Sequence, residues 1–411
     1  MSSHTLAATS FCGVFVDGDR ERLPYEADAY INQLGWYAVA GENTVVRRTS
    51  EELIVHPTWP TEWQSQMVLM AWADYLHSGD SGFLAKHYER LKFLTLRERL
   101  GPDGLVSTVQ PALSKEFLAR ARLGRLNDIV DWPAGERDGC EMLPVNTVVN
   151  AFCYMALVRA GDIAAALGKS DDATALRADA ARLAAAMERH LVDPATGLFV
   201  DGLGSKHSSA HATFFPLAFG LVPAVRRAAA LAHLNARIQA RQGGFPCSVY
   251  AAQYLLEALF ENGADQTALD LIRNRTDRGW LHMIESVGTT VTLEAWDQKY
   301  KSNLDWNHAW GAAPANILPR YLIGVRPTGP GWSSWVCRPA AAFLARISGQ
   351  VAASIPTPEG AIEVSFRKEP ALVVSVTVPA GTRGVLDLPA ACGIATRTLE
   401  AGVHEFTARN P

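Results

Sequence analysis

The sequence has few of the features that mark a nucleic-acid-binding or membrane protein. Lys and Arg number 38 against 42 Asp and Glu, a formal net charge of -4, and no basic block or stripe occurs. We therefore expect no nucleic-acid partner. No run of about 18 apolar residues is present, so no membrane-spanning helix is expected. The N-terminus lacks a basic start followed by a sustained apolar core, which predicts no secretory signal and a cytoplasmic location.

Cysteine is also sparse, and its spacing carries no motif. No C-x-x-C pair occurs among the six cysteines, which are Cys12, Cys140, Cys153, Cys247, Cys337 and Cys392. This pattern predicts reduced thiols, with neither a disulfide framework nor a zinc site. An apolar fraction of 48% with 19% charged residues is typical of a globular chain.

Helical hairpins dominate the chain from about residue 60 to 325. "VNTVVNAFCYMALVRAGDIAAALG" leads through "KSDD" into "ATALRADAARLAAAMERHL", and "SVYAAQYLLEALFENG" followed by "ADQTALDLIRNRT" repeats the layout. Successive helix pairs predict a mainly α fold, a barrel or toroid of hairpins, over residues 1–325. After residue 326 apolar and polar residues alternate between Gly and Pro turns, as in "GAIEVSFRKEPALVVSVTV". This pattern predicts a small antiparallel β-sandwich over residues 326–411.

Two stretches could hold the paired carboxylates that cleave a glycosidic bond, one to protonate the departing oxygen and one across the sugar. The first is "VFVDGDRERLPYEAD", where Arg20 can hold a neighbouring carboxylate ionised while Glu21 points elsewhere. A solvated, salt-bridged turn is the alternative. The second is "HMIESVGTTVTLEAWDQKYKSNLDWNHAWGAAP", in which Glu285, Glu294, Asp297 and Asp305 alternate with Trp296, Trp306, Trp310 and His308. Carboxylates beside Trp and His are typical of carbohydrate pockets, although a buried polar network is the alternative.

A third stretch, "DIVDWPAGERDG", places Asp131 and Trp132 in a loop rich in charge. A structural ion-pair cluster is the alternative there. Together with "VNTVVNAF", "GTTVTLEAWD" and "NHAWG", and in the same order along the chain, these stretches resemble the bacterial α-L-rhamnosidases of glycoside hydrolase family 78. The resemblance implies an (α/α)6 barrel followed by a β-sandwich. It also implies inverting hydrolysis of terminal α-L-rhamnosides without a metal ion or organic cofactor.

The resemblance also implies roles for individual residues. Glu21 falls at the general acid and Glu294 at the general base. Inversion would separate the two carboxyl groups by roughly 6.5–9.5 Å. The rhamnoside would be bound by Asp28, Arg20, either Asp17 or Asp19, and by Trp63, Trp132 and His308. The stretches themselves add Asp131 and Trp296 as candidate sugar-binding residues, and Glu285, which is close to Glu294 in the same stretch, as the alternative base.

The chain departs from this family in two places. "MSSHTLAATSF" can supply only the end of the first barrel helix, so we expect that helix to be incomplete. Pro24 and Tyr25 stand where many members have Gly and Trp. Two other functions therefore stay open: a weakly active or inactive rhamnoside-binding protein, and another six-hairpin glycosidase.

Overall fold

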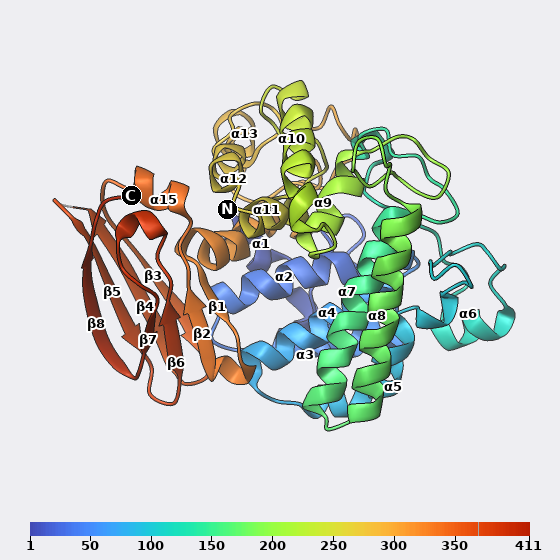
Figure 1. Cartoon of the computed structure of the whole chain (residues 1–411), viewed down its shortest axis with the longest axis horizontal. Helices are drawn as coiled ribbons and strands as arrows, with labels where there is room; N and C mark the ends of the chain where they lie inside the picture. Colours follow the sequence, from blue (N-terminus) through green and yellow to red (C-terminus); the bar gives the residue numbers. More distant parts are fainter. Residues whose placement is uncertain (369) are drawn as a thin grey trace.

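The computed structural model describes residues 1–368 and 370–411 and places a helical part beside a β part (Figure 1). The α-helices of the barrel part are α1 Ser2–Ala8, α2 Glu26–Val39, α3 Thr44–Val55, α4 Thr61–Ser78, α5 Gly82–Leu94, α6 Lys115–Ala121, α7 Thr147–Ala166, α8 Ser170–His190, α9 Ala210–Ala218, α10 Ala224–Ala240, α11 Ala252–Glu261, α12 Asp265–Ile272, α13 Trp280–His282 and α14 Pro314–Ile317, which a π-helix extends through Leu318–Ile323. One further helix, α15 Ala341–Arg346, lies between β2 and β3 in the sequence.

Six helices form the inner ring of a barrel. α2, α4, α7, α9, α11 and α14 pack against one another in that order, and α14 closes the ring on α2. The outer helices α3, α5, α8, α10 and α12 each follow and contact their inner partner, while α1 packs against α14 and α2. The predicted six-hairpin toroid is therefore confirmed. Its first helix, α1, is only 7 residues long.

α7 and α8 show how sequence pattern separates inner from outer helices. α7 is apolar on most of its surface and is buried against α4, α8 and α9. α8 has a single buried stripe at helical spacing, formed by Leu176, Ala180, Leu183 and Met187. By length and composition α7 could cross a membrane, but 67% of its most apolar window is buried, as expected of the core helix of a barrel.

The β part is a sandwich of two four-stranded sheets. One sheet has the order β1-β2-β6-β7 and the other β3-β4-β5-β8. The strands are β1 Val325–Pro327, β2 Ser334–Cys337, β3 Gly349–Thr357, β4 Gly360–Lys368, β5 Leu372–Val378, β6 Arg383–Leu386, β7 Arg397–Leu399 and β8 Gly402–Ala408. Alternate residues of β5 are buried, as the sequence pattern predicts. The predicted antiparallel sandwich is confirmed, and among the described strands one pair, β2 and β6, runs parallel. In the sequence, β3, β4 and β5 of the other sheet come between β2 and β6.

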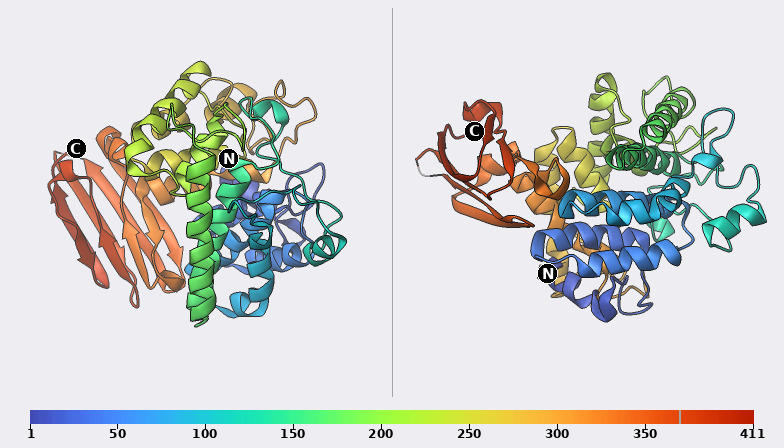
Figure 2. Two further views of the ribbon diagram at one scale, coloured as in Figure 1. Left: turned by 45° about the vertical axis from the view of Figure 1, so that its right-hand side comes forward. Right: turned by 90° about the horizontal axis from the view of Figure 1, so that it is seen from below.

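The sandwich covers the end of the barrel at which the inner helices finish. α2 contacts β3, and Gly79 at the end of α4 touches Gly331 in the turn before β2. In Figure 2 the sandwich lies on one side and α6 with its neighbouring loops on the other. The segments that precede the inner helices therefore gather at the uncovered end. Isolated β-bridges join them in pairs: Gly18 with His308, Pro60 with Asn127, and Asn146 with Gly202.

Candidate active site

A cavity of about 490 Å³ opens at the uncovered end of the barrel. Its lining comes mainly from four segments. These precede α2, surround the start of α4, span residues 129–133 and precede α14. The lining residues are Asp17, Arg20, Glu21, Tyr25, Asp28, Trp59, Trp63, Ile129, Trp132, Pro133, Glu294, Tyr300, Lys301, Ser302, Asn303, His308 and Trp310. This volume falls within the range of small-molecule sites, which is roughly 300–1,000 Å³.

Close backbone contact brings the first and last of these segments together. The Ala309 amide donates to the Asp17 carbonyl oxygen over 2.6 Å, next to the bridge between Gly18 and His308. A Cβ atom on Gly18 would lie 2.7 Å from both the Asn307 carbonyl oxygen and Asp305 Oδ2. Only glycine fits here, because the absence of a Cβ atom lets the backbone at Gly18 pass close to the segment before α14.

Glu21 lies at the mouth of the cavity, with a side chain that is 37% exposed. The Arg20 guanidinium contacts its Oε1 over 2.8 Å, and the Tyr25 hydroxyl donates to its Oε2 over 2.7 Å. The loop turns at Arg22, a non-glycine residue with φ of +57°. The Leu23 amide then donates to Asp17 Oδ1 over 3.0 Å, which closes the turn and fixes where Glu21 projects.

Glu294 lies deeper in the same cavity, with only 3% of its side chain exposed. Lys301 Nζ lies 3.1 Å from Oε2, and Arg20 Nη2 lies 3.5 Å from Oε1. The Asp305 amide donates to Oε2 over 2.8 Å, and the Trp310 indole donates to the Glu294 carbonyl oxygen over 2.9 Å. Two cations and a backbone donor are what an ionised carboxylate needs when it is buried.

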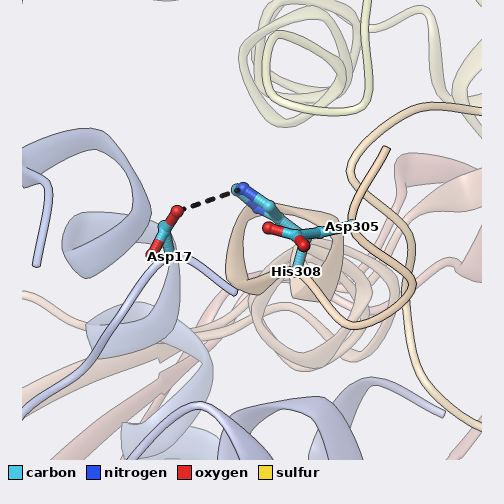
Figure 3. Close-up of side chains that lie close together, drawn as sticks. All are labelled: Asp17, Asp305 and His308. Atoms are coloured by element: carbon cyan, nitrogen blue, oxygen red, sulfur yellow. Dashed lines mark ion pairs between the residues drawn. The ribbon is translucent and has the colours of Figure 1, made fainter. Parts of the chain in front are cut away.

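Asp17, Asp28 and His308 form a buried cluster on the floor of the cavity, and Asp305, which does not line the cavity, lies next to Asp17 and His308. Figure 3 shows Asp17, from the segment before α2, facing His308 and Asp305, from the segment before α14. His308 Nε2 lies 4.0 Å from Asp17 Oδ2, and His308 Nδ1 lies 3.3 Å from Asp28 Oδ1. Within the described part of the chain, neither His308 Nδ1 nor Asp28 Oδ1 makes a hydrogen bond, and these two buried atoms face each other. Both residues line the cavity.

Burial sets the charge state of this cluster. It raises the pKa of Asp17 to about 6 and raises the pKa of Asp28 well above its usual range. It also lowers the pKa of His308 well below the usual range, and the nearby Arg20 and Lys301 add to that effect. Neutral imidazole and partly protonated carboxyl groups can both donate and accept hydrogen bonds, as sugar hydroxyls require.

The same cluster includes a candidate cation site. Asp17, Asp305 and His308 each offer one ligand atom, and these atoms lie within 4.8 Å of one another. Positive charge is already present, however, because Arg20 Nε lies 3.9 Å from Asp305 Oδ1. Asp17 also uses Oδ1 to accept the Leu23 amide. The donor set therefore fits a hydrogen-bonding role better than a metal ion.

An aromatic side faces these polar groups. Trp63 is buried, packs edge-on against Tyr25 with ring centroids 5.8 Å apart, and lies on the cavity surface. Trp132, at 39% exposed, lies at the mouth. The two segments are joined by Glu62, which accepts the amides of Ile129 and Val130. Flat indole faces opposite hydrogen-bonding groups suit a sugar ring.

Three residues predicted to bind substrate do not line the cavity. Trp296 is fully buried, stacks on Phe245 at 4.7 Å and donates its indole N–H to the Cys247 carbonyl, so it is a packing residue. Asp131 is fully buried and accepts hydrogen bonds from His211, Ser248 and the Trp132 amide, so it supports the aromatic side from behind. Asp19 accepts a hydrogen bond from Asn307 and does not line the cavity, whereas Asp17 does.

The alternative base, Glu285, also lies outside the cavity, where it pairs with Arg275 at an exposed position. Sequence reasoning missed several lining residues, namely Tyr25, Trp59, Tyr300, Lys301, Ser302 and Asn303. All of them stand within a few residues of a predicted site residue. Their place beside a predicted carboxylate or tryptophan was the available signal, but their side-chain directions depend on the folded loops.

Two family models match consecutive parts of the chain. Residues 2–322 match the bacterial alpha-L-rhamnosidase 6 hairpin glycosidase domain, and residues 324–397 match the bacterial alpha-L-rhamnosidase C-terminal domain. No curated protein matches the chain.

Solved α-L-rhamnosidases have similar folds. The enzyme from Dictyoglumus thermophilum is 18% identical with a TM-score of 0.75, and the match covers 99% of this chain and 49% of that one. The Streptomyces avermitilis enzyme complexed with L-rhamnose is 18% identical with a TM-score of 0.78, and the match covers 99% of this chain and 41% of that one. The Aspergillus terreus enzyme is 17% identical with a TM-score of 0.78, and the match covers 99% of this chain and 49% of that one. This chain thus spans half or less of each of these proteins.

Proposed function

Because this chain belongs to the bacterial α-L-rhamnosidase family, we propose that it hydrolyses terminal α-L-rhamnosides, with Glu21 as general acid and Glu294 as general base. The observation that carries the proposal is that these two carboxylates line one cavity of sugar-binding character and share one guanidinium. A glycosidase requires a pair of carboxylates that flank the scissile bond.

The contacts of Arg20 limit how far apart the two carboxylates can lie. Its guanidinium is 2.8 Å from Glu21 Oε1 and 3.5 Å from Glu294 Oε1. Since both distances end on one small planar group, the two oxygens lie within about 9 Å of each other, a limit compatible with the roughly 6.5–9.5 Å of inverting pairs. An inverting pair needs this gap because a water molecule enters between the sugar and the base.

The two glutamates have environments suited to different roles. Glu21 is at the mouth, where a leaving group can reach it and where the acid can regain its proton from solvent. Glu294 is buried beside Lys301 and Arg20, so it is stabilised as the carboxylate that takes a proton from water. Its Oε2 is occupied by Lys301 and the Asp305 amide, which leaves Oε1 to face the water.

The sugar would lie across the floor of the cavity. Asp28 and His308, which both line the cavity, would bind ring hydroxyls. Trp63 and Trp310 would pack against the apolar face and the C6 methyl group of rhamnose. Asp131 would act indirectly, by holding the backbone of Trp132.

The test is hydrolysis of 4-nitrophenyl α-L-rhamnoside, with proton NMR of the first sugar released. We expect β-L-rhamnose first, and release of the α anomer first would contradict inversion. Glu21→Gln and Glu294→Gln should each lose about 10²–10⁴-fold in turnover with unchanged unfolding temperatures. Glu285→Gln is the matched control from the same segment as the base and should keep full activity. Rhamnose binding by calorimetry without hydrolysis would instead favour a binding protein.

A further inference from the structure

Among the residues that the structure describes, Tyr25 is the one uncharged side chain that donates a hydrogen bond to the candidate acid. Its hydroxyl lies 2.7 Å from Glu21 Oε2, while Arg20 lies 2.8 Å from the other oxygen. Each oxygen of the Glu21 carboxylate therefore has its own donor. The two donors differ in kind. Arg20 lies close to both glutamates, whereas the hydrogen bond of Tyr25 goes to Glu21 and not to Glu294.

The position of Tyr25 is fixed from several sides. It is the N-cap residue of α2, and its carbonyl oxygen accepts the Ala29 amide over 2.8 Å. Its ring packs edge-on against Trp63 on the cavity side. A phenol with these constraints cannot follow Glu21 if that side chain rotates, so the hydrogen bond selects one orientation of the acid.

The hydroxyl can act only as a donor toward a charged Glu21. Burial raises the pKa of Tyr25 above its usual range, and the neighbouring Glu21 raises it further. The phenol therefore keeps its proton throughout the working pH range. A neutral donor 2.7 Å from a carboxylate stabilises the negative charge without changing the net charge of the site.

We propose that Tyr25 is a positioning residue for the acid: its hydroxyl orients the Glu21 carboxyl group and stabilises the carboxylate that remains after the proton has gone to the glycosidic oxygen. This inference rests on the proposed function, since it takes Glu21 to be the proton donor. Its consequence depends on the leaving group. A basic leaving group needs nearly complete proton transfer, so it gains most from Tyr25, whereas nitrophenolate needs little help.

The test compares Tyr25→Phe with the wild type on methyl and 4-nitrophenyl α-L-rhamnosides. We expect kcat on the methyl rhamnoside to fall about tenfold, the size of one hydrogen bond to a charged group, with a smaller loss on the nitrophenyl substrate and little change in KM.

Tyr88→Phe is the matched control. Tyr88 donates a hydrogen bond of the same 2.7 Å length to Asp172, and it does not line the cavity. It should leave kcat on both substrates unchanged. Equal losses on the two substrates in Tyr25→Phe would overturn the inference and leave the proposed function intact. An inactive wild type on both rhamnosides would overturn the proposed function, and this inference with it.

Discussion

Asp17→Asn should stabilise the protein at neutral pH, although it removes a group from the active site. Burial is the main cause that raises the pKa of Asp17 from 3.8 to about 6, and the charges of Glu21 and Asp305 add to it. His308 offers no compensating charge, because its own pKa is lowered and the imidazole stays neutral. At neutral pH the charged Asp17 carboxylate is therefore less stable in the folded protein than in the unfolded chain, which lowers the free energy of unfolding.

The magnitude follows from the size of the shift. A rise from 3.8 to about 6 is roughly two pH units, which corresponds to about 3 kcal/mol of stability. Between these two values the folded state keeps a proton that the unfolded chain has lost, so stability falls as pH rises through this window. The full cost is present above about pH 6 and absent below about pH 4.

The assay is calorimetric unfolding of Asp17→Asn and wild type at pH 4 and pH 7.5. The isosteric amide can still accept the Leu23 amide, so we expect equal midpoints at pH 4 and a variant midpoint a few degrees higher at pH 7.5. Activity should fall at the same time, a trade of function against stability. Asp19→Asn, an exposed neighbour in the same loop, is the control and should change neither. A variant midpoint that is lower at pH 7.5, or shifted equally at both pH values, would refute the reasoning.

Three further results are expected. Lys301→Met removes the closer cation from Glu294, 3.1 Å away, so kcat/KM should fall; an unchanged kcat/KM would show that Arg20 alone suffices. Asp131→Ala leaves several buried donors without an acceptor, so the free energy of unfolding measured in urea should fall by about 3 kcal/mol and rhamnose should bind more weakly. A fall of less than about 1 kcal/mol would contradict this. Dialysis against EDTA should leave hydrolysis of the nitrophenyl rhamnoside unchanged, whereas a loss restored by a divalent cation would assign the cluster around His308 to a metal.

Local pattern explains what the sequence predicted well. The spacing of apolar residues within about twenty positions is enough to predict each helix of a pair, as in α7 and α8. Glu21 and His308 stand in short segments whose residue types match a chemical task, and the structure brings these segments to one cavity.

The errors share one physical cause, which is burial decided by distant parts of the chain. Trp132 and Trp296 look alike in sequence, each beside an aspartate, yet Phe245 and Cys247 cover Trp296 while Trp132 faces the cavity. The contact of Lys301 with Glu294 depends on how a loop returns on itself, and no periodic signal encodes it. The parallel pairing of β2 with β6 similarly depends on chain crossover.

Closure of the ring by α14 on α2 has a consequence for the order in which the protein becomes competent. The Thr292 amide donates to Thr5 Oγ1, a residue 287 positions earlier, so the segments of the proposed acid and base meet at a seam between the beginning and the end of the barrel. A ribosome-bound chain that has emerged only to about residue 290 could already bury most of its apolar helices, but it would lack the segment that holds Glu294. The proposed turnover would therefore report that the last hairpin has docked, and it should appear later in synthesis than compactness does.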